Sequence, residues 1–434
     1  SARAKGEAAS GSLRTSRTSP AGKAKADRLF GDDSVNERRF HPGWVVVGAC
    51  VAVMFGVWNP HAGFGVFLPV LAREFGWSRG AISVASSLNL LIGGAVGFAV
   101  GAANDRYGPR PILALGSLLA GLGYLFASAV NALWHFYLVV GGFLGIAMSG
   151  MYFVPAATAS RWFVEQRGLA LGIIQAGVNF PFVTGGPLSA FLISRFGWRT
   201  AYRLLAGLIW VLAVPASLFT RVPASDGSWA ARAIPSTGAT FRQALADRRL
   251  WLLSGSLGLT GFAYMMVVVH IVPHVKDRGV TLEAASLALT IFGVSQIVGG
   301  LVFGAVADRL GTRRTFRACL VVELVTLAGV AVGPSLPVLY VLIMCLGLAA
   351  AGGDTTVMKS VSEIFGVKAI GAILGAMNLG WRAGAGLGPA AGGFIYDATG
   401  SYAIAFGIAS AGLLISLTLF TLATSPRRGA GAGW

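Results

Sequence analysis

One arginine stands in the middle of a long apolar stretch of this sequence. Arg382 is flanked by small residues in the segment Gly380-Trp-Arg-Ala-Gly384. A charged side chain inside a membrane-spanning segment is costly and usually marks a functional path. Its guanidinium fork matches a carboxylate with two parallel hydrogen bonds. We therefore predict that Arg382 binds an anionic substrate. The alternative is a permanent ion pair with Asp354 or Glu323, the acids of two neighbouring apolar stretches.

Two clusters that contain a proline interrupt other apolar stretches near their centres. Asn59-Pro60-His61 lies in the first stretch and Asn179-Phe-Pro181 in the fifth. A proline frees backbone groups that a cavity or a neighbouring helix must satisfy. His61 is one of the few groups that change charge near neutral pH, so it is a candidate for proton coupling. An interhelical hydrogen bond is its alternative role.

Three more polar side chains fall near the centres of apolar stretches, where hydrogen bonding between helices is the alternative role for each. With them, the predicted substrate site consists of Arg382, Asn59, His61, Tyr152, Asn179, Tyr264 and Gln296. His270 lies towards one end of its stretch, where a gate or an interface anchor is expected. Lys359 and Glu363 are four residues apart, a spacing that allows an ion pair with each other at a helix end. A solvated helix end is the alternative, and the one we favour.

The composition indicates that membrane-spanning helices position these side chains. Of 434 residues, 55% are hydrophobic and only 12% are charged, and the mean hydropathy is +0.70. A helix needs about 20 apolar residues to cross a bilayer. Twelve such stretches are present, so we predict an all-α membrane protein with twelve transmembrane helices in two six-helix bundles. The predicted helices are 44–71, 81–103, 111–130, 133–157, 168–193, 200–219, 250–272, 284–305, 318–332, 338–361, 370–395 and 402–422.

The distribution of basic residues predicts the orientation. Lys and Arg concentrate in the two tails and in alternate loops, which places both termini in the cytoplasm by the positive-inside rule. The predicted segments are a disordered basic tail (1–41), a first bundle (42–220), a cytoplasmic linker (221–248), a second bundle (249–424) and a C-terminal tail (425–434). The first tail lacks the apolar core of a signal peptide. We expect a multi-pass protein of the plasma or inner membrane.

A duplicated loop is the most specific pattern in the sequence. The form G-x-x-x-D-R-x-G-x-R occurs once after the second predicted helix and once after the eighth. Its members are Gly101, Asp105, Arg106, Gly108 and Arg110 in the first copy, and Gly304, Asp308, Arg309, Gly311 and Arg313 in the second. The first glycine is expected to let helices approach, the aspartate to pair with a helix end or an arginine, and the second glycine to make the turn. We predict that both loops are conformational latches.

With this loop, the chain resembles the major facilitator superfamily, whose signature it is. The resemblance covers about residues 44–422 and implies a central cavity between two pseudo-symmetric six-helix halves. The segments Trp162-Phe163, Arg167-Gly-Leu-Ala-Leu-Gly172 and Asp397-Ala-Thr-Gly-Ser-Tyr402 resemble the monocarboxylate transporters and the related oxalate/formate antiporters. These segments imply an organic anion as the substrate.

The charged dyad of the monocarboxylate transporters is missing here. Those relatives carry an aspartate and an arginine one turn apart in helix 8, where this chain has Gln296 and Gly300. Arg382 stands at the position of the helix 11 basic residue of the antiporters. Because this chain keeps only one of the two basic residues of the antiporters, a monocarboxylate is favoured over a dianion as the substrate.

Other functional classes find little support in the sequence. The five histidines and three cysteines show no metal-ligand spacing, and no phosphate-binding G-x-x-x-x-G-K-[ST] loop is present. We predict no enzyme activity, no cofactor or metal, no nucleic-acid partner and a monomer in the lipid bilayer. The predicted function is alternating-access transport of a small organic anion, with protons as possible co-substrates. Anion exchange and export of drugs or neutral solutes are the alternatives.

Overall fold

The computed structural model describes residues 41–163, 166–223, 238–333, 335–366 and 369–425. Within these ranges every named element is a helix, and a single isolated bridge joins Gly238 to Gly366. Backbone groups in lipid must be satisfied within a segment, which explains why long apolar stretches fold as helices. The predicted all-α fold is confirmed. The predicted tails fall almost wholly outside the described residues.

We call the helices from α2 to α9 the first bundle. It consists of α2 (Pro42–Ala62), α3 (Phe64–Phe75), α4 (Arg79–Tyr107), α5 (Pro109–Ala127), α6 (Leu133–Phe136), the π-helix η1 (Tyr137–Phe143), α7 (Leu144–Met148), α8 (Phe153–Trp162) and α9 (Arg167–Ser217). The break between α2 and α3 falls at Gly63, directly after the predicted Asn59-Pro60-His61 interruption. Asn89 of α4 donates to the carbonyl of Val140 in the π-helical segment.

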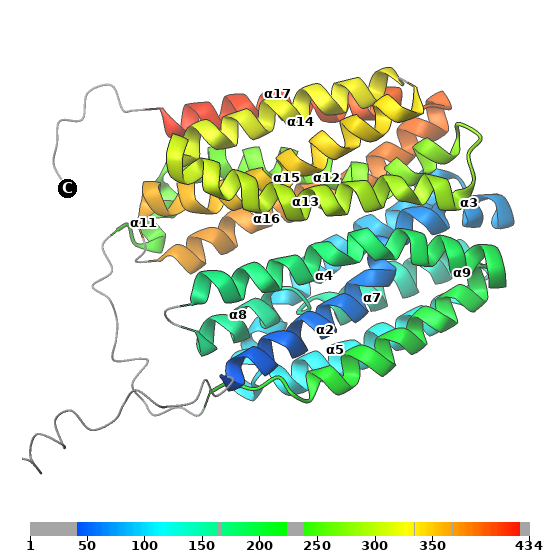
Figure 1. Cartoon of the computed structure of the whole chain (residues 1–434), viewed down its shortest axis with the longest axis horizontal. Helices are drawn as coiled ribbons and strands as arrows, with labels where there is room; N and C mark the ends of the chain where they lie inside the picture. Colours follow the sequence, from blue (N-terminus) through cyan, green and yellow to red (C-terminus); the bar gives the residue numbers. More distant parts are fainter. Residues whose placement is uncertain (1–40, 164–165, 224–237, 334, 367–368, 426–434) are drawn as a thin grey trace, which may run out of the picture. The chain divides into compact units, whose positions relative to one another are not determined.

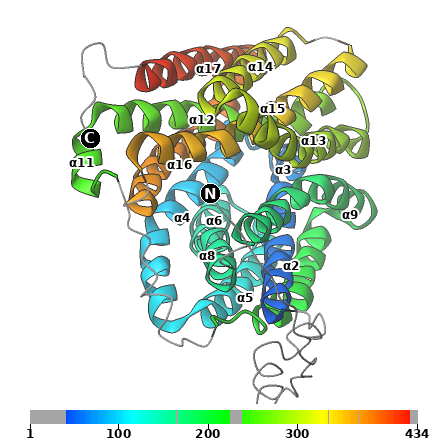
Figure 2. The same ribbon diagram turned by 60° about the vertical axis from the view of Figure 1, so that its left-hand side comes forward.

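We call the helices from α11 to α17 the second bundle. It consists of α11 (Phe241–Ala246), α12 (Arg248–Lys276), α13 (Leu282–Leu310), α14 (Thr312–Val332), α15 (Leu336–Phe365), α16 (Ile370–Thr399) and α17 (Ala403–Thr424). Of these, α11 lies within the segment predicted as a linker. Figure 2 shows these helices on one side and α2, α5, α8 and α9 on the other. The same kind of N-cap occurs once in each bundle: Ser78 caps α4 and Thr281 caps α13, each through its hydroxyl oxygen.

Ten helical segments of the described chain are long and apolar enough to cross a membrane. One of them is α9, whose 51 residues would span about 75 Å as a single helix. Its backbone is non-helical at Gly197 (φ 75°, ψ 160°), so two helices meet there, as the predicted boundary between 193 and 200 requires. The 30-residue α16 is not among the ten. The exact count of twelve stays a prediction.

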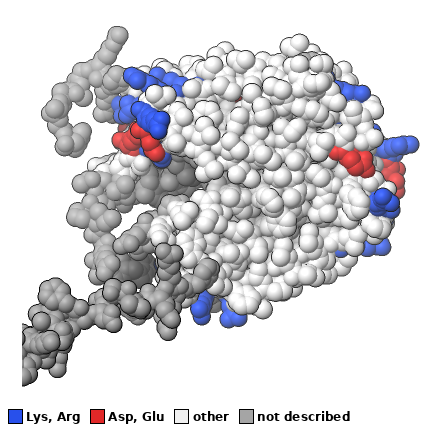
Figure 3. Space-filling view, in the orientation of Figure 1, with Lys and Arg blue, Asp and Glu red and all other residues white. Residues whose placement is uncertain are grey.

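On the face drawn in Figure 3, charged side chains gather at the two ends of the helices and leave a broad belt without charged side chains between them. We name the ends by their residues. The motif end carries the loops of Asp105 and Asp308, and the Arg79 end carries the start of α4 and the end of α12. The belt is the surface expected of a protein that spans the hydrocarbon core of a bilayer.

The two duplicated loops have matching geometry at the motif end. Gly108 and Gly311 each have a positive φ, 80° and 85°, and each ends one helix and begins the next. Asp105 forms an ion pair with Arg161 at 2.9 Å, and Asp308 forms one with Lys359 at 2.7 Å. The Asp105 pair lies within the first bundle and the Asp308 pair within the second. Neither of these two ion pairs therefore joins the bundles in this conformation.

The prediction for the first glycine of each loop is wrong. Open space lies beside Gly304, and a Cβ on Gly101 would only reach ordinary contact with Phe153. Close helix approach occurs elsewhere, above all at Gly384 of α16, which lies against the backbone of Gly258 in α12. Gly101 and Gly304 are therefore not the glycines that permit the closest helix packing.

The ion pair that the spacing of Lys359 and Glu363 allows does not form. Lys359 reaches Asp308 instead, and Glu363 accepts a hydrogen bond from Thr312 at 2.7 Å. Each side chain therefore connects α15 to a neighbouring helix, Lys359 to α13 and Glu363 to α14. An ion pair between Lys359 and Glu363 would have connected α15 only to itself.

Candidate functional site

Arg382 lies near the middle of α16 at the boundary between the bundles. Its side chain is half-buried and packs against Gly94 of α4, where a Cβ would come within 3.0 Å of the Arg382 Cδ. No hydrogen bond or ion pair to its guanidinium forms among the described residues. Neither Asp354 nor Glu323 pairs with it. The alternative of a permanent internal ion pair therefore finds no support.

Asp354 is the second charged group at this level. Counting 1.5 Å per residue from the motif end, Asp354 and Arg382 lie about 17 and 18 Å deep along their helices. Asp354 interacts electrostatically with Tyr152 of the first bundle and Tyr264 of the second. Its side chain is exposed although protein surrounds it. The Asp354 carboxylate is thus accessible to solvent and within electrostatic reach of both bundles.

Two of the predicted wall residues are in contact in the second bundle. Tyr264 donates to Oε1 of Gln296 at 3.1 Å, and its ring lies 6.3 Å from that of Trp381, the neighbour of Arg382. In the first bundle, the Tyr152 hydroxyl lies 3.3 Å from Oε1 of Gln175. That Tyr152 shares one site with Tyr264 and Gln296 stays a prediction.

The remaining predicted residues lie within the first bundle. Asn59 is fully buried and donates to Thr184 at 2.6 Å. His61 contacts Trp58 edge-on and lines a small cavity whose other walls all belong to the first bundle, among them Asn89 and Tyr124. Asn179 is 7% exposed. A direct contact of these three side chains with a substrate stays a prediction.

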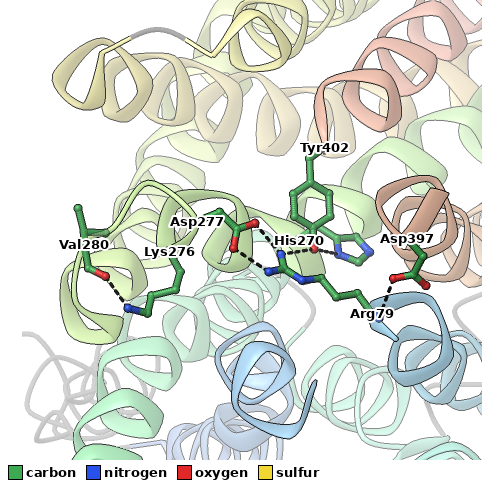
Figure 4. Close-up of polar contacts among 7 residues, drawn as sticks. All are labelled: Arg79, His270, Lys276, Asp277, Val280, Asp397 and Tyr402. Atoms are coloured by element: carbon green, nitrogen blue, oxygen red, sulfur yellow. Dashed lines mark hydrogen bonds and ion pairs between the residues drawn. The ribbon is translucent and has the colours of Figure 1, made fainter. Parts of the chain in front are cut away.

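A polar network, which the sequence analysis did not identify, joins the bundles at the Arg79 end (Figure 4). Both terminal nitrogens of Arg79 donate to Asp277, each at 2.7 Å, and the guanidinium stacks on the ring of Tyr396 at 3.9 Å. Asp397 accepts from the backbone nitrogens of Arg79 and Gly80 at 2.9 and 2.8 Å. Arg79 and Gly80 begin α4 of the first bundle, whereas the acids belong to the second.

His270 extends this network into the second bundle. It is fully buried, and its Nε2 lies 2.8 Å from the carbonyl oxygen of Pro389. A carbonyl only accepts, so Nε2 carries the proton and Nδ1 accepts from the Tyr402 hydroxyl at 3.2 Å. The Tyr402 oxygen in turn accepts from Arg79 at 3.1 Å. Every group in this chain of hydrogen bonds has a consistent donor or acceptor role.

The contacts between the bundles lie towards the Arg79 end. On α4 they involve Arg79, Gly80, Ser87, Leu91 and Gly94, and on α16 they begin at Arg382 and end at Asp397. Thr290 of α13 donates to the carbonyl of Val183 in α9. Figure 1 shows the helices of the two bundles as an upper and a lower group. The structure is therefore closed at the Arg79 end.

A model of the Major Facilitator Superfamily matches residues 46–285 and 253–433. The chain belongs to this superfamily. Monocarboxylate transporter 13 of Rattus norvegicus is 28% identical over 380 residues, which cover 86% of each chain. Monocarboxylate transporter 11 of Homo sapiens is also 28% identical, over 86% of this chain and 81% of the relative. The resemblance predicted from the sequence is confirmed at the level of the superfamily, and these relatives are transporters and not enzymes.

Solved structures of the superfamily have the same fold. A bacterial homologue of the human lysosomal transporter Spinster, in an inward-facing and unoccupied conformation, aligns with a TM-score of 0.72 at 16% identity, over 89% of this chain and 97% of the other. A mutant of the nucleoside transporter NupG also aligns with a TM-score of 0.72, at 14% identity over 88% of this chain and all of the other. At such identities the likeness concerns the fold of this major facilitator protein alone.

Proposed function

We propose that this protein is a secondary transporter of a small organic monocarboxylate that works by alternating access. The observation that carries the proposal is Arg382, a guanidinium without an ion pair among the described residues, at mid-depth between the bundles. The N–H donors of an unpaired guanidinium are free to bind a ligand, and a carboxylate accepts two parallel hydrogen bonds from them. The named transport function of the monocarboxylate relatives supports the same substrate class.

The charges around the site favour one carboxylate over two. Arg382 is the only Lys or Arg near mid-depth among the described helices, and Asp354 lies at the same level. A second carboxylate on the substrate would meet no second cation and would face Asp354 instead. The aromatic rings of Tyr264 and Trp381 offer an apolar surface to the organic part of the substrate.

The transport cycle follows from the contacts at the two ends. We assign the motif end to the cytoplasm, following the basic residues of its loops, so the conformation described here opens inward. The network of Arg79, Asp277 and Asp397 closes the outer end. During the cycle that network breaks, and the Asp105 and Asp308 loops are proposed to latch the bundles in the opposite, outward-open state.

Counterflow in proteoliposomes tests the proposal. Vesicles preloaded with unlabelled lactate should take up labelled lactate, and short monocarboxylates should compete while succinate should not. Arg382→Gln should abolish this uptake without changing the yield of folded protein. Uptake that persists in Arg382→Gln contradicts the proposed role of Arg382. Transport of a nucleoside or a drug that short acids do not inhibit would favour the neutral-solute alternative, for which the fold shared with NupG is the supporting observation.

A further inference from the structure

Glu323 is a buried acid without a role in the transport site described above. It lies in the middle of α14 with 7% of its surface exposed. No hydrogen bond or ion pair to its carboxylate forms among the described residues. A buried ionised carboxylate without a partner costs several kcal/mol or more. A group that retains such a cost calls for a functional explanation.

The cavity that Glu323 lines is apolar apart from one hydroxyl group. Together with Tyr264, Glu323 lines this small cavity, whose other walls are apolar side chains, among them Phe292 and Leu346. Tyr264 donates its proton to Gln296 Oε1, and the buried Nε2 of Gln296 has no partner among the described residues. The cavity thus contains an acid with no cation to neutralise it.

Gly353, the residue before Asp354 on α15, lies against the Glu323 carboxylate. A Cβ on Gly353 would come within 3.3 Å of the Glu323 Oε1, so the absence of a side chain there lets the carboxylate pack against the backbone of α15. The two acids interact electrostatically, and both lie about 17 Å from the motif end. Asp354 is exposed, whereas Glu323 is buried in the second bundle. The pair therefore leads from an exposed acid to a buried one.

The groups that face Glu323 leave a proton as its natural partner. They are Asp354 from α15, Tyr264 from α12 and, on its own helix, Cys319. The described part of α17, which also packs against α14, contributes no titratable side chain. Among the described residues, no Lys, Arg or His faces Glu323. A buried carboxylate with no cation nearby and a second acid within electrostatic reach is costly to ionise, so Glu323 is expected to hold a proton.

We propose that Glu323 and Asp354 form a proton-binding site that couples proton movement to transport, which rests on the function proposed above. Glu323 holds one proton as a neutral acid, and a second proton from water binds to the exposed Asp354 carboxylate. With both acids neutral, an anionic substrate approaches Arg382 without repulsion from Asp354. After release of the substrate anion Arg382 is again unpaired, which favours loss of the Asp354 proton to water.

Infrared difference spectroscopy of the purified protein tests the site without any substrate. Near neutral pH, the wild type should show the carbonyl stretch of a protonated carboxylic acid that shifts in D₂O. Glu323→Gln should remove this band. Glu363→Gln is the matched control, because Glu363 lies on α15 at the motif end and bonds Thr312, and it should leave the band intact. A wild type without the band, or a band that survives in Glu323→Gln, overturns the proposal.

Transport measurements separate this proposal from the function on which it rests. With lactate as the probe, wild-type vesicles should acidify during net uptake, and Glu323→Gln and Asp354→Asn should lower net uptake far more than counterflow. Equal loss of both modes, or uptake driven by sodium in place of protons, contradicts the coupling role. If the wild type moves no lactate in any mode, the proposed function fails, whereas the infrared result still decides the proton site.

Discussion

The ion pair between Arg79 and Asp277 should set how often the Arg79 end opens. Its side chains are 15% and 32% exposed, and the bidentate contact joins the two bundles. A hydrogen bond to a charged group contributes about 1.5–3 kcal/mol, and partial exposure lowers this towards the value of a surface pair. Asp277→Asn should therefore destabilise the closed state by about 1–2 kcal/mol. The population open at this end should rise roughly 5–30-fold.

Distances between spin labels measure this population directly. Labels on Phe196 and Ser335, both exposed near the Arg79 end and one in each bundle, should report a longer distance in the open state. The background lacks the three native cysteines Cys50, Cys319 and Cys345. Asp277→Asn should enlarge the long-distance fraction.

Glu74→Gln is the matched control for this measurement, because Glu74 pairs with Arg199 at 3.8 Å inside the first bundle. It should leave the distance distribution unchanged. An unchanged distribution in Asp277→Asn, or equal shifts in both variants, would refute the assignment of Arg79 and Asp277 as the closing contact.

Three further predictions concern the network, the helix packing and the loops. Tyr402→Phe leaves Nδ1 of the buried His270 unpaired, so it should destabilise the closed state of the Arg79 end by about 1–2 kcal/mol. The label distances should then shift in the same direction as in Asp277→Asn. Gly384→Ala should lower stability by about 1–3 kcal/mol because the new methyl group meets the backbone of α12, whereas Gly375→Ala on the same helix faces open space and should not; thermal melting distinguishes them. Asp105→Asn combined with Asp308→Asn should change the melting temperature little, since both acids are 71% exposed, but should slow counterflow if the loops latch the other state.

The sequence predicted the helices well because lipid imposes a simple rule on them. Apolar length located the spans to within a few residues, and Gly197 separates two of them where a boundary was expected. The largest discrepancy is α14, which begins at Thr312 and not near residue 318. Arg313, Arg314 and Arg317 ended the apolar stretch, yet a helix continues through charged turns once it leaves the hydrocarbon core.

The site was only partly predictable, since contacts between distant helices depend on their rotation about their axes. Arg382 stood out through its charge alone. Arg79 did not, because a basic residue next to a predicted span is usually an interface residue, and its partners lie about 200 and 320 positions away. Asp354 was considered only as a partner for Arg382. The signal that could have identified it was its own position at mid-depth beside two glycines.

Binding of a matched pair of ligands, lactate and its uncharged amide, tests the central role of Arg382 most directly. A ligand that binds only the folded state raises its melting temperature, by an amount that corresponds to about 2.7 kcal/mol at a hundredfold excess over Kd. Lactate should stabilise the wild type and the control Arg203→Gln, whose side chain bonds Ser128 in the first bundle. Lactamide should stabilise neither, and Arg382→Gln should lose the response to lactate. Equal stabilisation by acid and amide, or a full lactate response in Arg382→Gln, would contradict the account.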